Sequence, residues 1–313
     1  MDPLMVPMYT SPNFGVTGYQ VLIISLLSLP PNIYFFCRCL TYSKFKERKL
    51  FKYIIIVMSL EYIYACIVHI TFYLYISIHY YTNRKVNLKT CSKLESIHYG
   101  SSHVSHVTLL YITVIRFYRI AYRKKPNVTV MGLIVLITLG PLAYLFIGKL
   151  FEISIYFVPR QGCGYDLYSK LPYYNYISYA NICVSFISTS ASLVISYLTY
   201  RVVVKKTPIS SKAKVAENKS LFKSFAIQSL FPFCYQVPAI IYYLIYLQIQ
   251  GKKVDTIEIF LNITYYSGHL LSIFLSLVVI RQFKIMMLND FRCKVLHKPI
   301  PVSRIEVKTT SLR

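Results

Sequence analysis

The stretch from Cys91 to Lys125 reads CSKLESIHYGSSHVSHVTLLYITVIRFYRIAYRKK. Residues 96–115 contain no Asp, Glu, Lys or Arg, and this uncharged run ends at Arg116. A helix needs about 20 predominantly apolar residues to cross the ~30 Å hydrocarbon core of a bilayer. The stretch therefore predicts a transmembrane helix over 94–117 with a basic cluster at one end.

The composition of the whole chain agrees with a membrane environment. The 313 residues are 55% hydrophobic and only 15% charged, whereas a soluble domain carries about 25% charged residues. The net charge of +24 would suit a nucleic-acid partner. However, the basic residues stand between long apolar blocks, as they do in the cytoplasmic loops of membrane proteins. We therefore expect a lipid bilayer as the environment and no nucleic acid as a partner.

Six further apolar blocks have the length of a transmembrane helix. With 94–117, the predicted spans are 19–37, 53–79, 128–148, 177–200, 224–248 and 256–280. Residues 1–18 form a short N-terminal segment, and residues 281–313 form a basic tail. Neither a basic stretch nor a small-residue cleavage site precedes the first span, so no removable signal peptide is expected. The sequence thus predicts an all-α membrane protein, a seven-transmembrane helix bundle.

Lys and Arg are distributed unevenly between the two sets of loops. Residues 38–52, 116–125, 201–223 and 281–313 hold 26 of the 35, and the opposite loops hold nine. Loops rich in Lys and Arg stay in the cytoplasm. The predicted N-terminus is therefore outside and the C-terminus is cytoplasmic, which requires an odd number of spans.

One face of the 94–117 helix joins polar side chains to a cation. At 100° per residue, His98, Ser102, Ser105 and Arg116 fall within about 40° of one line. These residues either form a functional stripe or pack helix against helix, as small polar residues do in membranes. His103 and His106 lie on another face and are expected to be packing residues, because a metal site would need more ligands.

Glu61 lies near the middle of the second span. A carboxyl group at that depth is costly unless it is neutral or paired, so Glu61 is a functional candidate. His269 lies about as deep in the seventh span and is the predicted partner of Glu61.

Several segments resemble a known receptor family. Cys91, followed 25 positions later by Arg116-Phe117-Tyr118, resembles the third helix of rhodopsin-like G-protein-coupled receptors. The run from Gln228 to Pro232 resembles the sixth helix of nematode chemoreceptors. Over 19–292 the chain resembles a nematode serpentine chemoreceptor of the Srg superfamily, close to the Srv and Sru groups. It departs from rhodopsin-like receptors at Ile115, where an acid is usual, and in lacking the Asn-Pro…Tyr signature of the seventh helix.

The resemblance implies a chemosensory receptor that binds an external small molecule and activates a cytoplasmic heterotrimeric G protein. Its implied place is the plasma membrane, in the cilium of a sensory neuron. It implies a disulfide between Cys91 and Cys163, although two unrelated thiols remain the alternative. The implied residues of the conformational switch are Arg116, Phe117, Tyr118, Glu61, His269 and Pro232.

The ligand pocket is predicted between the third, fifth, sixth and seventh spans. Its predicted residues are His98, Ser102, Ser105, Tyr179, Ser185, Tyr242 and Tyr266. Because these groups carry no fixed charge, they suit a small neutral or weakly polar ligand, without a cofactor or metal. His98 replaces the aspartate of amine receptors, and an imidazole is no dependable counter-ion for ammonium.

Two other classes of membrane protein are weighed against the receptor. A secondary transporter usually has repeated halves with interrupted spans at matched positions, and no such repeat is evident. A transporter or channel for a small solute remains the alternative function. An enzyme would need converging His, Asp or Glu at one membrane face; only 11 acids occur in the chain, and no enzymatic activity is expected.

Overall fold

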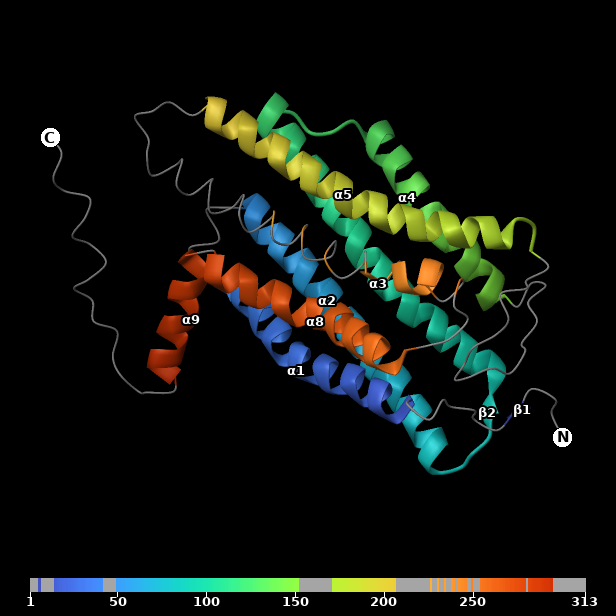
Figure 1. The fold of residues 1–313 in the computed structure, drawn as a ribbon. Helices are drawn as coiled ribbons and strands as arrows, with labels where there is room; N and C mark the ends of the chain where they lie inside the picture. Colours follow the sequence, from blue (N-terminus) through green and yellow to red (C-terminus); the bar gives the residue numbers. More distant parts are fainter. Residues whose placement is uncertain are drawn as a thin grey trace, which may run out of the picture.

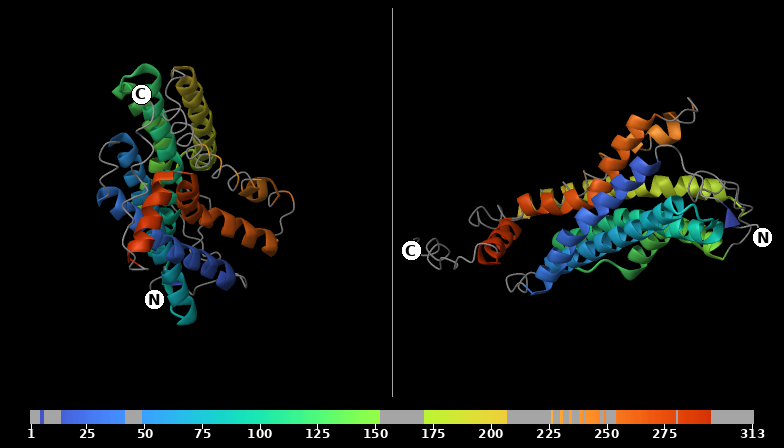
Figure 2. Two further views of the ribbon diagram at one scale, coloured as in Figure 1. Left: turned by 90° about the vertical axis from the view of Figure 1, so that its left-hand side faces the viewer. Right: turned by 90° about the horizontal axis from the view of Figure 1, so that it is seen from below.

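The computed structural model describes residues 5–6, 14–41, 49–151, 171–206, 254–279 and 281–294, together with scattered positions within 226–249. In this part of the chain, the long helices run side by side in an elongated bundle (Figure 1; Figure 2). The helices are α1 (Phe14–Thr41), α2 (Lys49–Tyr81), α3 (Leu88–Phe117), α4 (Val128–Leu150), α5 (Tyr174–Lys206), α8 (Asp255–Val279) and α9 (Arg281–Lys294). Two short π-helical segments, η2 (Tyr118–Tyr122) and η3 (Ile241–Tyr246), complete the helical part.

These helices coincide with six of the predicted spans, and most of 224–248 lies outside the described residues. Four helical segments are long and apolar enough to cross a bilayer. They are Gly18–Thr41, Lys52–Tyr81, Val128–Leu150 and Tyr174–Lys205. The chain is therefore an all-α membrane protein, and the count of seven spans and the orientation stay predictions.

The helix α3 lies at the centre of the bundle. It packs against α2, α4 and α5, and most of its polar side chains are buried, including Ser101, His103 and His106. The helix α4 shows the opposite pattern, because it is strongly apolar but only Thr138 and Gly148 are buried. Polar residues thus face the protein interior, while apolar residues face outward where lipid would lie.

Several buried hydroxyl groups are hydrogen-bonded within their own helices. Ser96 Oγ donates to Ser92 O at 2.8 Å, and Ser192 Oγ donates to Ser188 O at 2.7 Å. Such bonds to the carbonyl one turn earlier satisfy a hydroxyl without a partner on another helix. Serine can therefore be placed in the interior of the bundle without a matching polar group on the facing helix.

The two ends of the bundle carry different accessory elements (Figure 1). At one end, the strand β1 (Met5–Val6) pairs antiparallel with β2 (Val86–Asn87), which immediately precedes α3. At the other end, α9 turns away from α8. Residues 281–294, predicted as part of a tail, are thus helical, and the remainder of that segment lies outside the described residues.

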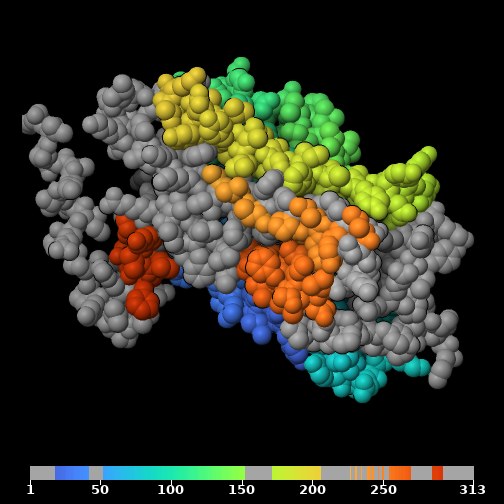
Figure 3. Space-filling model, viewed as in Figure 1, coloured from blue at the N-terminus to red at the C-terminus, as the bar shows by residue number. Residues whose placement is uncertain are grey.

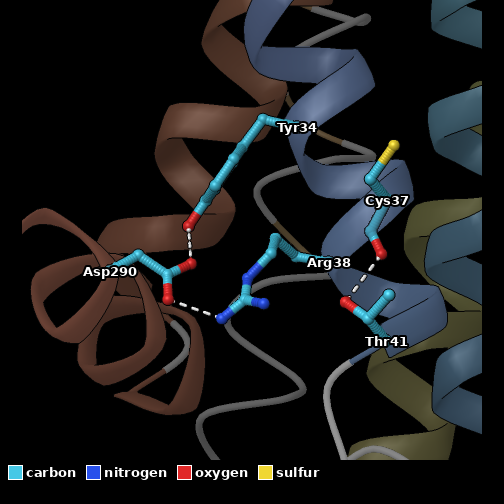
Figure 4. Close-up of polar contacts among 5 residues, drawn as sticks. All are labelled: Tyr34, Cys37, Arg38, Thr41 and Asp290. Carbon is cyan, nitrogen blue, oxygen red and sulfur yellow. Dashed lines mark hydrogen bonds and ion pairs between the residues drawn. The ribbon is translucent and has the colours of Figure 1, made fainter. Parts of the chain in front are cut away.

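An ion pair fastens α9 to the end of α1 (Figure 4). The Arg38 guanidinium lies 2.5 Å from Asp290 Oδ1, and Tyr34 Oη donates to Asp290 Oδ2 at 2.6 Å. The Arg38 and Asp290 side chains are 25% and 16% exposed, so water screens the pair only in part. Arg38 is one of the basic residues assigned above to the cytoplasmic side.

We expect Asp290→Ala to loosen α9 from α1. Loss of a partly exposed pair costs about 1 kcal/mol, which raises the open population roughly fivefold. Trypsin cleavage at the exposed Lys284 of α9 should therefore accelerate by a similar factor. Asp255→Ala, which removes the same charge at the start of α8, is the control, and the exchange Arg38→Asp/Asp290→Arg should restore slow cleavage. Equal rates for both alanine variants would contradict the role of the pair.

A close approach at Gly148 sets the end of α4. A Cβ atom at this position would lie 2.2 Å from Leu171 Cδ1, whereas Cβ atoms at Gly132 and Gly140 would meet nothing within 4 Å. The absence of a side chain at Gly148 therefore lets the segment before α5 pack against α4.

Gly148→Ala should lower the melting temperature of the purified protein, because Leu171 must move to admit the methyl group. Gly132→Ala should leave it unchanged or raise it, since alanine in a helix interior is favoured over glycine by about 0.5–1 kcal/mol. The comparison is a thermal unfolding scan of both variants in one detergent. A lower melting temperature for Gly132→Ala than for Gly148→Ala would be the opposite of this expectation.

Candidate functional site

The central polar helix α3 presents two different faces to its neighbours. His98 lies on the face toward α2 and α8, where it contacts the rings of His69, Phe72 and Tyr266. Its ring centroid is 4.5 Å from that of His69, and its Nε2 lies 3.3 Å from Tyr266 Oη. Packed rings fill this region. The predicted ligand residues His98 and Tyr266 therefore belong to an aromatic cluster and do not line the cavity described next.

A cavity of about 540 Å³ opens on another face of α3. Its walls come mainly from α3, α4 and α5, with Ala239 and Tyr265 contributing from the last third of the chain. The volume lies within the usual range of roughly 300–1,000 Å³ for small-molecule sites. This cavity, rather than the aromatic cluster around His98, is the candidate binding site.

His103 holds three helices together at the wall of this cavity. Its Nε2 lies 3.1 Å from Thr138 O on α4, and its Nδ1 lies 2.6 Å from Ser185 Oγ on α5. A carbonyl oxygen only accepts, so Nε2 carries the proton, and the neutral ring then accepts the Ser185 hydroxyl at Nδ1. The expectation that His103 is merely a packing residue missed this link.

Glu95 and Lys149 also line the cavity. Glu95 comes from the first turns of α3 and Lys149 from the last turn of α4, and the two charges interact with each other. The predicted pocket contains no fixed charge, whereas this cavity contains two charged residues. Sequence reasoning missed Glu95 and Lys149 because both lie at the ends of predicted spans, where charged side chains usually contact water.

A regular spacing identifies the cavity face of α3. Glu95, Tyr99, His103 and His106 all line the cavity. At 100° per residue, they fall within an arc of roughly 80°. His98, Ser102 and Ser105 lie on the adjacent face of the same helix.

The other predicted pocket residues occupy several environments. Ser185 lines the cavity. Ser102 is buried beside Tyr265, and Ser105 donates to Ser101 O at 3.2 Å. Tyr179 is 55% exposed. Tyr242 is buried in η3, where its hydroxyl contacts Val254 N at 2.8 Å and Val254 O at 3.3 Å.

The structure does not bring the predicted pocket residues together in one cavity. Of its seven residues, Ser185 alone is among the described residues that line the cavity. η3 lies between α5 and α8 on the face seen in Figure 3, and Tyr242 ties it to the start of α8.

Three of the predicted switch residues, Arg116, Phe117 and Tyr118, lie at the opposite end of α3. Arg116 is buried in its last turn, and Phe117 and Tyr118 each contact the ring of Tyr122. Glu61 accepts a hydrogen bond from Thr108 Oγ1, which joins α2 to α3. Pro232 and the side chain of His269 lie outside the described residues, so the Glu61–His269 pairing stays a prediction.

Cys91 is completely buried and forms a disulfide. Cys163 lies outside the described residues, so its pairing with Cys91 stays a prediction. Among the described residues, no group of three or more His, Cys, Asp or Glu side chains has an arrangement that could hold a metal ion.

The sequence matches no protein-family model, and no curated protein is recognisably similar to it. The class that can be stated from fold and site together is a helical membrane protein with a cavity beside its central helix.

The His103–Ser185 bond generates a stability prediction. Ser185→Ala should lower the free energy of unfolding by about 1–3 kcal/mol, because it leaves the Nδ1 atom of a buried imidazole without its donor. Ser192→Ala removes a buried hydroxyl of the same helix that bonds to a carbonyl within α5, and it should cost less, because it leaves no side chain of another helix without its donor. Equal losses in the two unfolding curves would mean that the link between helices contributes nothing.

Proposed function

We propose that this chain is a chemosensory G-protein-coupled receptor of the plasma membrane. In this proposal, a small external molecule binds beside α3, and the cytoplasmic end of the bundle activates a heterotrimeric G protein. The resemblance to nematode chemoreceptors further assigns it to a sensory neuron and its cilium. The observation that carries the proposal is that one central helix lines the cavity near one end and holds a buried arginine near the other.

Distances along α3 support this division of labour. The cavity-lining residues extend from Glu95 to His106, and Arg116 lies ten residues further on, or about 15 Å along the axis. At that separation, a ligand and a cytoplasmic partner can both contact α3 without contacting each other.

Contacts between α3 and α5 provide a route for a conformational change. The His103–Ser185 bond joins the two helices at the cavity, and η2, which continues α3, packs against α5 at the other end. A ligand that displaces α5 relative to α3 would therefore alter the surface beside Arg116, provided that it binds the two arrangements with different affinities.

The proposal predicts a specific phenotype for Arg116→Ala. The variant should reach the cell surface in normal amount, and its activation of G protein should be lost. Arg119→Ala removes one exposed cation three residues later and should signal normally, because it lowers the charge by the same amount without touching the buried Arg116. The measurements are surface labelling and a calcium reporter in cells that co-express a promiscuous G protein and are screened with a panel of small molecules. Normal signalling by Arg116→Ala would remove Arg116 from the switch.

The same cells separate the receptor from a transporter or channel. In cells without G-protein α subunits, a receptor response disappears, whereas solute uptake or ionic current persists. Uptake or current that survives under these conditions would contradict the receptor assignment and support the alternative.

A further inference from the structure

The cavity is lined by apolar side chains and by two charged groups. Leu142, Leu145 and Phe146 of α4 and Ile182 of α5 supply the apolar surface. Among the described residues that line the cavity, Glu95 is the one carboxylate and Lys149 the one ammonium. Charged residues at membrane depth face the protein interior or a cavity and mark functional sites.

The two charges come from different helices, Glu95 from α3 and Lys149 from α4. The first part of α5 forms the third wall of the cavity. Both Glu95 and Tyr174, at the first residue of α5, line the cavity, and they lie within electrostatic reach of each other. Asn181 also lines the cavity, and its buried Oδ1 accepts no hydrogen bond from the described residues. The wall therefore has acceptor capacity that the described part of the protein leaves unused.

We propose that the cavity binds an amphipathic zwitterion, a small molecule with an ammonium group, a carboxylate and an apolar side chain. The ammonium faces Glu95 and Asn181, the carboxylate faces Lys149, and the side chain packs on the α4 wall. This inference names the ligand class of the receptor function proposed above and rests on the same cavity.

Charge balance favours a zwitterion over the other ligand classes. A simple cation would bring a second positive charge near Lys149, and a simple anion would bring a second negative charge near Glu95. Like charges brought together in a partly desolvated site are unfavourable, and that repulsion excludes wrong ligands. A neutral ligand would leave the interaction between Glu95 and Lys149 in place and would gain no ionic contact with either residue. A zwitterion provides both partners and adds no net charge.

The test uses five probes that share a phenyl ring and differ in charge. Phenylalanine and glycylphenylalanine are zwitterions with short and long charge separation, phenethylamine is a cation, hydrocinnamate is an anion, and hydrocinnamamide is neutral. Each is added at about 10 mM to the full-length protein purified in detergent, which reveals sites with Kd below roughly 1 mM. At least one zwitterion should raise the melting temperature by roughly 3–5 °C, and the other three probes by less.

Variants then assign each ligand charge to its partner. Glu95→Gln should reduce the zwitterion shift and make hydrocinnamate bind as well as the zwitterion. Lys149→Gln should do the same in favour of phenethylamine. Lys93→Gln, a half-buried position of α3 that does not line the cavity, should leave all five shifts unchanged. The exchange Glu95→Lys/Lys149→Glu should retain zwitterion binding, because both partners are still present.

Several outcomes would overturn the proposal. It is wrong if neither zwitterion raises the melting temperature more than hydrocinnamamide, including the case in which no probe has an effect. It is also wrong if Lys93→Gln abolishes binding as strongly as Glu95→Gln does, or if both single cavity variants leave the zwitterion shift intact. In that last case, Glu95 and Lys149 interact only with each other and do not bind the ligand.

The binding assay contains no G protein, so its failure is distinct from failure of the receptor function. Zwitterion binding without any calcium response would leave the ligand class standing and remove the signalling role. A calcium response to a neutral molecule, without zwitterion binding, would support the signalling role and contradict the proposed ligand class.

Discussion

The inward orientation of polar groups around α3 is the constraint on which the rest of the bundle depends. In the hydrocarbon core no water is present to bond an exposed hydroxyl or imidazole, so these groups must be satisfied inside the protein. Ser96 and Ser192 meet this need with carbonyls of their own helices, and His103 meets it with groups from α4 and α5. The apolar surfaces of α1, α2, α4 and α5 are then left to face outward.

The two faces of α3 also differ in how closely they are packed. Toward α2 and α8, the rings around His98 and Tyr266 fill the space and fix the position of the helix. Toward α4 and α5, the side chains leave a cavity, and His103 on its wall is bonded to both of these helices. In the proposed receptor, the packed face would hold α3 in place while a ligand in the cavity displaces α5.

Helix positions follow from the sequence because a long uncharged run flanked by Lys and Arg has the length and the end chemistry of a membrane-spanning helix. Accordingly, α2 and α4 begin and end within about one turn of the predicted bounds. The candidate site was harder to predict. Periodicity groups His98 with Ser102 and Glu95 with His103, but it does not say which neighbouring helix each face meets. That choice depends on tertiary packing, so periodicity alone does not distinguish the aromatic stripe from the pocket wall.

Residues at the ends of spans are difficult to assign from sequence for a related physical reason. Sequence counting treats Lys149 as a topology signal, because Lys and Arg beside apolar runs usually contact water and lipid headgroups. Here the end of α4 lies close to the segment before α5, since Gly148 carries no side chain to keep Leu171 away. Lys149, the next residue, thereby lines the cavity. Similarly, Asp290 could not be matched with Arg38 before the turn between α8 and α9 was known.

The short pairing of Met5 with Asn87 imposes an order on biosynthesis. The first strand leaves the ribosome long before its partner, which follows α2 in the chain. In the predicted orientation, the N-terminal segment crosses as α1 inserts and waits on the outer side until α2 has crossed as well. A bulky domain fused directly before Met5 would meet the growing chain at that moment, whereas one fused after α9 would join a bundle whose first helices had already assembled.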